Sequence, residues 1–315
     1  MRLVARRLLQ AIPLLLVISL VLFTVLHLIP GGPLSAYLEN PNVRTEDIER
    51  LRKAMGLDRS LASQYLSWLF AFLRGDWGYS YADGRPVAER LLERIPATLE
   101  LIASAVALAL LAAIPAGVFG AVRRNVDRIT GVAAVAGISL PVFWFGLIMQ
   151  LLFAGLLGWL PSSGRASFGS SGISDKFVHL IMPAAVLAAA LASTWSRYLR
   201  RMIQETMSAP FIAVGRSRGL SERTLLWHHA LVNALPVFIT VVLLDASMLA
   251  SGAVVTESIF AWPGVGSLFV DSLAKRDYAV LMAFMMSGSI VVVALNFVSD
   301  LLVLQLDPRT RERLP

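Results

Sequence analysis

The stretch LLQAIPLLLVISLVLFTVLHLI at residues 8–29 decides the fold class, because its apolar side chains follow one another without a single charge. A helix rises 1.5 Å per residue, so a run of about 20 such residues is long enough to cross the hydrocarbon of a bilayer. The sequence PGGP at residues 30–33 offers no clean small-residue cleavage site. We therefore expect an uncleaved membrane anchor here, and not a signal peptide.

Further apolar runs of similar length follow along the chain. The 315 residues are 57% hydrophobic and only 16% charged, with a mean hydropathy of +0.69, whereas a soluble domain would carry more charge. A chain in lipid must satisfy its backbone internally, which favours helices. The sequence therefore predicts an all-α membrane protein with six transmembrane helices. The five after residues 8–29 are expected at about 98–122, 129–157, 177–195, 235–256 and 280–306.

Arginines in the short loops predict the orientation of these spans. Short loops that are rich in Arg and Lys stay in the cytoplasm. With the N-terminus inside, the short outside loops hold only Arg165, Lys176, Lys275 and Arg276. The inside segments hold Arg2, Arg6, Arg7, Arg123, Arg124, Arg128, Arg197, Arg200, Arg201, Arg216, Arg218, Arg223, Arg309, Arg311 and Arg313. Both termini are therefore expected in the cytoplasm.

The segment from Gly31 to Pro96 is predicted to be a large, partly helical extracytoplasmic loop between the first two spans. A helix capped by Thr45 is expected, with the acidic side chains of Glu46 and Asp47 in its first turn favourable to the helix dipole. The sequence LASQYLSWLFAFL at residues 61–73 is too short to span the bilayer, and its aromatic side chains suit the membrane interface.

Several kinds of function lack a sequence signal. The chain has no cysteine, so thiolate chemistry and cysteine-ligated metal sites are excluded. Its net charge of +7 comes from arginines beside apolar runs, which indicates membrane topology and not nucleic-acid binding. No G-x-x-x-x-G-K-[ST] loop is present to hold ATP phosphates, and no histidines show metal-ligand spacing. We predict no catalytic, cofactor-binding or metal-ligating residue.

The segment at residues 196–234 is unusually long and polar for a loop between two predicted spans. It is expected to form a helix to about Arg218, a break at Gly219, and a second helix capped by Ser221. Such a helical hairpin is a good docking surface for a soluble partner. From composition alone, a solvated basic loop is the favoured interpretation.

Motifs spread along almost the whole chain favour the docking surface. Within the loop they are FIAVGRSRGLS (211–221), WHHAL (227–231) and NALP (233–236). Elsewhere they are LRGDWGYS (73–80), RIPATLEL (94–101), SLPVFWFG (139–146), GAVVTE (252–257), WPGVG (262–266), RDY (276–278) and LDPR (306–309). In this order they resemble the permease subunits of binding-protein-dependent ABC importers, in the dipeptide, oligopeptide and nickel branch.

This resemblance implies an ATP-driven importer in a bacterial or archaeal cell membrane, the inner one where there are two. The chain would work with a second, similar permease, two ATP-binding subunits that hold the ATP, and an external binding protein that delivers the substrate. Its parts would be residues 1–96 (first helix and outer loop), a permease core at 97–306, and a cytoplasmic tail at 307–315. The substrate is left open among dipeptides, longer peptides, a nickel chelate, glutathione and oligosaccharides.

The resemblance also assigns roles within the 196–234 loop, which would be the coupling loop. Gly215 and Gly219 would shape the hairpin, while Arg216 and Arg218 would contact the ATPase or serve only as positive-inside charge. Phe211 and Leu220 belong to the same motif. The family often has arginine where this chain has Ala213, and alanine where it has Gly215, which leaves the detail of the docking contact open.

Three carboxylates, Glu100, Asp245 and Asp300, fall within or near predicted spans, where an unpartnered charge is costly. Asp300 is expected near the inner end of the sixth span, where it would meet the basic cytoplasmic rim. Asp245 lies near the middle of the fifth span. It either faces the pore and meets a cationic group of the substrate, or forms a hydrogen bond to a neighbouring helix. Glu100 is expected close to the outer interface, within reach of water.

Two other classes of function compete with the importer. A gradient-driven secondary transporter or channel often shows repeated halves, and no repeat is visible here. An intramembrane enzyme needs paired catalytic groups or metal ligands at membrane depth, and no such set can be assembled without arbitrary choices.

Overall fold

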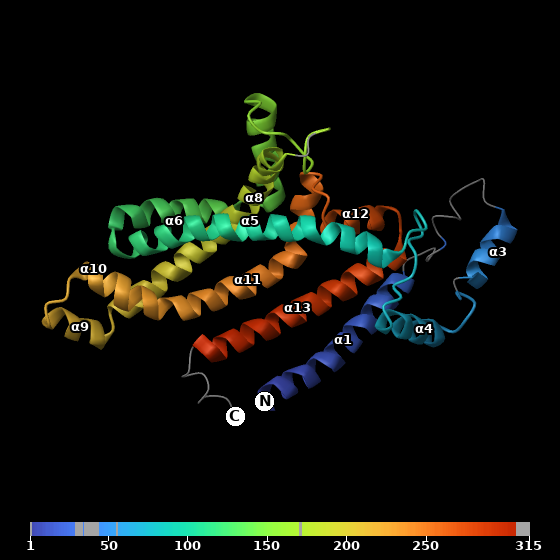
Figure 1. The fold of residues 1–315 in the computed structure, drawn as a ribbon, viewed down its shortest axis with the longest axis horizontal. Helices are drawn as coiled ribbons and strands as arrows, with labels where there is room; N and C mark the ends of the chain where they lie inside the picture. Colours follow the sequence, from blue (N-terminus) through green and yellow to red (C-terminus); the bar gives the residue numbers. More distant parts are fainter. Residues whose placement is uncertain (1, 29–33, 35–43, 55, 170–171, 307–315) are drawn as a thin grey trace. The chain divides into compact units, whose positions relative to one another are not determined.

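The computed structural model describes residues 2–28, 34, 44–54, 56–169 and 172–306, and these residues form helices joined by turns and short loops (Figure 1). Within this part of the chain, the only β-structure is an isolated bridge between Tyr79 and Pro86. Five segments are long and apolar enough to cross a membrane, which confirms an all-helical, multi-pass architecture. They are Leu9–Leu28, Val87–Val122, Ile173–Met207, Glu222–Ala246 and Tyr278–Ser299.

The third predicted span, at 129–157, is not one continuous helix. The chain instead forms α6 (Arg124–Ser139), α7 (Val142–Met149) and the π-helix η2 (Gln150–Leu156). Helical structure stops at Leu140 and Pro141. A proline lacks the N–H that a helix interior needs and disfavours helical geometry in the residue before it. Among the described residues, five segments are therefore long and apolar enough to span, and the predicted count of six is not confirmed.

The chain separates into two compact units. The first unit comprises Met1–Ala97 and Gly264–Val293, and the second comprises Thr98–Pro263 and Ala294–Pro315. The first unit contains α1 (Arg2–Leu28), α3 (Thr45–Ala54), α4 (Leu61–Leu73), α12 (Val265–Ala274), the beginning of α5 (Val87–Val122) and much of α13 (Tyr278–Leu306).

Helix α4 of the first unit covers residues 61–73, the segment predicted to be too short to span the bilayer. It begins after Ser60, whose side chain accepts a hydrogen bond from the Ser63 N–H. Its aromatic face packs on α1, where Phe23 lies edge-on to Tyr65 with ring centroids 5.5 Å apart. The Tyr65 hydroxyl also lies 2.8 Å from Ser19 Oγ, so the polar tip of this tyrosine has a partner on α1.

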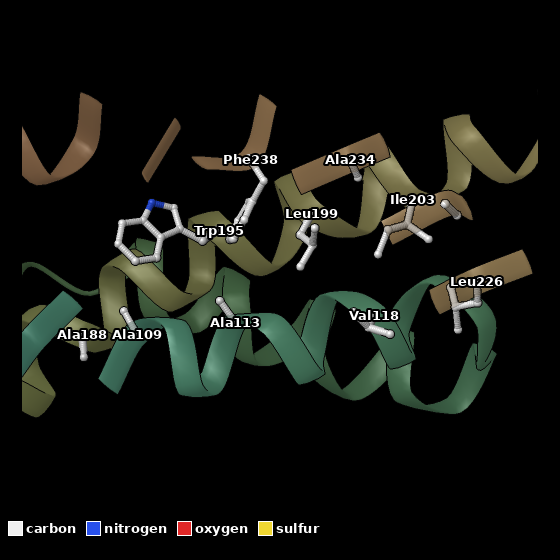
Figure 2. Close-up of a cluster of buried hydrophobic side chains, with 11 residues drawn as sticks. Ala109, Ala113, Val118, Ala188, Trp195, Leu199, Ile203, Leu226, Ala234 and Phe238 are labelled. Carbon is white, nitrogen blue, oxygen red and sulfur yellow. The ribbon is translucent and has the colours of Figure 1, made fainter. Parts of the chain in front are cut away.

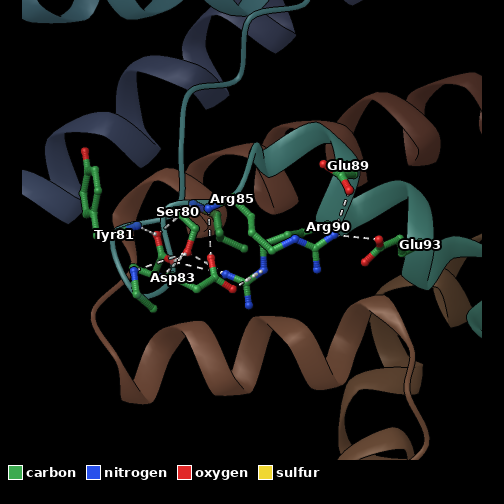
Figure 3. Close-up of polar contacts among 10 residues, drawn as sticks. Ser80, Tyr81, Asp83, Arg85, Glu89, Arg90 and Glu93 are labelled. Atoms are coloured by element: carbon green, nitrogen blue, oxygen red, sulfur yellow. Dashed lines mark hydrogen bonds and ion pairs between the residues drawn. The ribbon is translucent and has the colours of Figure 1, made fainter.

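A buried polar cluster holds the 76–86 loop of the first unit in place (Figure 3). The Asp277 carboxylate is fully buried, and it accepts hydrogen bonds from Ser80 Oγ at 2.5 Å and from the Tyr81 N–H at 3.1 Å. Arg90 Nη1 lies 2.7 Å from Ser80 Oγ and 3.4 Å from Asp277 Oδ2. The charge of Asp277 is therefore balanced by a guanidinium, as a buried carboxylate requires.

The second unit is built around α8 (Ile173–Met207). This helix packs against α6 and against α11 (Leu231–Ile259), and it shares a buried apolar cluster with α5 (Figure 2). Small residues allow the close approach. A Cβ atom placed on Gly117 of α5 would lie 2.9 Å from Leu199 Cβ, and one on Gly137 of α6 would lie 2.2 Å from Ser193 Oγ. Such small-residue contacts are how helices pack in membranes.

Candidate functional site

The segment at residues 208–230, hereafter the hairpin, interrupts the helices between α8 and α11. Helix α8 ends at Met207, and α9 (Pro210–Ser217) begins three residues later with a proline in its first turn. The first helix predicted for this segment was expected to continue to Arg218, and that continuity is wrong. Proline at the start of a helix loses no hydrogen bond, whereas inside a helix it removes one and disfavours continuation of the preceding turn.

The turn at Gly219 has the geometry predicted from the sequence. Gly219 has φ +83°, a left-handed conformation that glycine adopts without the steric cost of a Cβ. The Leu220 N–H donates to the Gly215 carbonyl at 3.2 Å, and the Gly219 N–H donates to the Arg216 carbonyl at 3.0 Å. These two bonds form a Schellman motif, which satisfies the last carbonyls of α9.

The second arm of the hairpin begins at Ser221, as predicted. The Ser221 side chain accepts a hydrogen bond from the Thr224 N–H at 3.2 Å and so caps α10 (Glu222–Thr224). A π-helix, η3 (Leu225–Ala230), then leads directly into α11. No turn separates η3 from α11, so continuous helical structure joins the hairpin to α11.

Gly215 lets the two arms of the hairpin pack closely together. A Cβ atom at this position would lie 2.8 Å from Leu225 Cδ2 and 3.3 Å from Leu220 Cδ1. Ile212 and Leu225 are almost completely buried beside it. An alanine at this position would require the end of the Leu225 side chain to shift.

The outer surface of the hairpin is apolar for a segment so rich in arginine. Phe211 and Val214 lie three residues apart on the exposed face of α9, with 48% and 49% of their surface accessible, and Leu220 is 39% accessible. Large apolar side chains gathered on one exposed face are typical of a surface that another protein covers.

Arg216 is held within the hairpin itself. Its Nε and Nη2 atoms contact the two Glu222 carboxylate oxygens at 2.5 and 3.0 Å, a bidentate ion pair across the turn. The hydrogen bond to this carboxylate raises the pKa of Arg216 above its ordinary value. Arg218 is exposed and forms no ion pair with any described residue, so its charge is presented outward.

Asp245 contacts a neighbouring helix. Its Oδ2 atom accepts a hydrogen bond from Trp195 Nε1 at 2.8 Å, joining α11 to α8 at the end of the buried cluster in Figure 2. This is the contact expected of the second interpretation of Asp245. Whether the carboxylate also meets substrate stays a prediction.

Several polar contacts of the second unit were not predicted from the sequence. Thr98 Oγ1 donates to the buried Glu257 carboxylate at 2.6 Å, and Arg165 Nε donates to Glu100 at 2.9 Å. The Gly164 N–H donates to the Phe260 carbonyl at 2.8 Å. Most of these residues lie within or beside the sequence motifs given above. The motifs therefore indicated that these residues matter, but not which of them form hydrogen bonds with each other. Among the described residues, no group of three or more His, Asp or Glu forms a metal-binding cluster.

Comparisons with known proteins place the whole chain in one family. Residues 113–312 match the binding-protein-dependent transport system inner membrane component, and residues 1–102 match the N-terminal part of such a membrane component. The oligopeptide transport system permease protein AppB of Bacillus subtilis (strain 168) is 37% identical over 97% of this chain and 98% of its own length. The glutathione transport system permease protein GsiC of Escherichia coli (strain K12) is 34% identical over 98% of both chains.

A solved structure supports the fold. A chain in an inward-facing structure of the MetNI methionine ABC transporter matches with a TM-score of 0.53 at 16% identity, over 70% of this chain and 98% of that one. These comparisons agree with the importer prediction and not with the gradient-driven alternative. The chain therefore belongs to the family of binding-protein-dependent transport system inner membrane components, as a multi-pass permease subunit of the cell membrane.

Proposed function

We propose that this permease subunit forms one half of the pore of an ATP-driven peptide importer and receives the energy of ATP hydrolysis through its hairpin. The observation that carries the proposal is the exposed apolar face of α9 on a hairpin that is closed by its own Gly219 turn. A preformed docking surface of this kind needs a soluble partner. The chain has no phosphate-binding loop of its own, so ATP must be bound by other subunits.

The proposed assembly contains this chain, a second similar permease, two ATP-binding subunits and an external binding protein. Both termini and the hairpin lie in the cytoplasm, as the arginine distribution requires. The divided helices α6, α7 and η2 together make the third of six spans. In this arrangement η3 passes the movement of the hairpin to α11, and α8 passes it to the rest of the second unit.

A peptide is the proposed substrate. The two relatives described above are named for oligopeptide and glutathione transport, and both of those substrates contain peptide-linked amino acids. The external binding protein would select among peptides, while the permease would admit those that it delivers. Asp245, held by Trp195, is the candidate contact for a cationic group of the substrate.

The docking surface is tested by affinity purification of the tagged assembly in mild detergent, followed by mass spectrometry and an ATPase assay. We expect Phe211→Asp to lose the ATP-binding subunits, because a charge replaces an apolar contact at the centre of the face. Trp159→Asp is the matched control, since Trp159 is 68% exposed on a different loop. Equal recovery of ATPase with both variants would refute the docking surface.

Reversal of the ion pair separates docking from folding of the hairpin. Arg216→Glu alone places two carboxylates side by side, whereas Arg216→Glu with Glu222→Arg restores the pair in the opposite direction. If Arg216 only shapes the hairpin, the double variant recovers coupled ATPase activity. If an ATP-binding subunit contacts the positive charge of Arg216 directly, the double variant stays defective in coupled ATPase activity while the hairpin remains folded.

A further inference from the structure

The outward face of α6 carries basic and apolar side chains in separate bands. Arg124, Arg128, Val132 and Val135 follow one another at helical spacings of four, four and three residues, and all four are exposed. Ile129 beside them is 71% exposed and Val132 is 73% exposed. Along one face of this helix, exposed arginines are therefore followed by exposed aliphatic side chains within about two turns.

The opposite face of α6 is occupied. Ala134 is 2% exposed, and Asp127 forms an ion pair with Arg200 of α8. Thr130 bonds the Val126 carbonyl on its own helix at 2.8 Å. Because α6 packs on α8 through this inner face, the arginines and valines of the outward face are exposed to the surroundings of the second unit.

The arginines on this face differ from their neighbours in having no carboxylate partner. Arg200 is neutralised by Asp127, and Arg201 pairs with Glu205 at 2.8 Å. Within the part of the chain that the structure describes, Arg124 and Arg128 form no ion pair. Arg123, at the turn before α6, lies over the Phe119 ring, 5.7 Å from its centroid.

We propose that this face, residues 123–135 of the α5–α6 turn and α6, binds an anionic phospholipid. The phosphate group would lie against Arg124 and Arg128, and an acyl chain would lie along Ile129, Val132 and Val135. Basic side chains at the end of membrane helices are suited to acidic lipid headgroups, and the start of a helix adds partial positive charge. An ATP-binding subunit would match the arginines but not the exposed valines below them.

Native mass spectrometry of the assembled transporter tests this site, after exchange into nanodiscs of phosphatidylcholine with increasing phosphatidylglycerol. The wild-type assembly should retain phosphatidylglycerol selectively. Arg124→Gln with Arg128→Gln should weaken that retention about 30-fold, since each arginine at an anionic surface contributes about 1 kcal/mol. Arg124→Lys with Arg128→Lys keeps the charges and should retain most of it.

Arg201→Gln is the matched control, because Arg201 is 79% exposed near the same end of the second unit but already has a carboxylate partner. Its retention of phosphatidylglycerol should equal that of the wild type. Equal retention of both lipids by the wild type would overturn the proposal, as would an undiminished preference in the double glutamine variant. Loss of the second permease or of the ATP-binding subunits from that variant would instead assign the face to a protein contact.

Discussion

The hairpin at residues 208–230 and the Asp277 cluster each contain an ion pair, which is exposed to solvent in the hairpin and buried in the cluster. In the hairpin, 49% of the Arg216 side chain and 62% of Glu222 are exposed. In the cluster, Asp277 is fully buried and only 13% of Arg90 is accessible. An exposed pair contributes at most about 1 kcal/mol, whereas removal of one partner from a buried pair costs several. The cluster is built to stay closed, while the hairpin takes its shape from Gly215, Gly219 and its capping hydrogen bonds.

Asp277→Ala is expected to have the largest effect on this comparison. It removes the acceptor of Ser80, Tyr81 and Arg90 together, at a cost of about 3 kcal/mol to local stability. Hydrogen exchange should show faster exchange of the 76–86 amides. Asp83→Asn is the matched control, because Asp83 is 41% exposed at 3.5 Å from Arg90 and should cost less than about 1 kcal/mol. Equal protection in the two variants would mean that Asp277 does not hold the loop.

Gly219→Ala comes next. At φ +83° a Cβ costs about 1–2 kcal/mol, so the Schellman bonds of the hairpin should open more often. The Leu220 amide is expected to exchange at least about fivefold faster, and ATPase activity should become less responsive to substrate. Unchanged exchange at this amide would show that the turn tolerates alanine without strain.

Ala261→Gly should stabilise its turn, the opposite of the effect of Gly219→Ala. A Schellman motif also ends α11, and there Ala261 occupies the left-handed position that Gly219 occupies after α9. Ala261 has φ +44°, and the Trp262 N–H donates to the Glu257 carbonyl at 2.8 Å. Relief of the strain is offset by the greater freedom of glycine in the unfolded chain, so the net gain is about 0.5 kcal/mol. Slower exchange of the Trp262 amide would confirm it, and faster exchange would show that Ala261 is not strained.

Local sequence chemistry predicted most of the helices and the turn of the hairpin. The Gly219 break and the Ser221 cap each depend on neighbouring residues, and both are observed. The presence of a proline did not by itself predict where a helix ends. Pro183 and Pro236 remain inside α8 and α11, whereas helical structure stops before Pro141 and Pro210.

The polar contacts could not be predicted because they join residues far apart in the chain. Ser80 and Asp277 are separated by 197 positions, and Trp195 and Asp245 by 50. Periodicity assigns a side chain to a face of its helix but does not reveal the partner that lies opposite. Arg216 shows the same limit, since its contact with Glu222 depends on the closed turn between them.

The central claim, that the hairpin couples this permease to an ATPase, is tested most directly by site-specific cross-linking. The chain has no natural cysteine, so Leu220→Cys in the assembled transporter provides a unique reactive position within this subunit. Trp159→Cys is the control. We predict that a short bifunctional cross-linker joins Leu220→Cys to an ATP-binding subunit, with a yield that changes on addition of ATP, and that Trp159→Cys gives no such product. Failure of Leu220→Cys to cross-link in an assembly that still hydrolyses ATP would contradict the account.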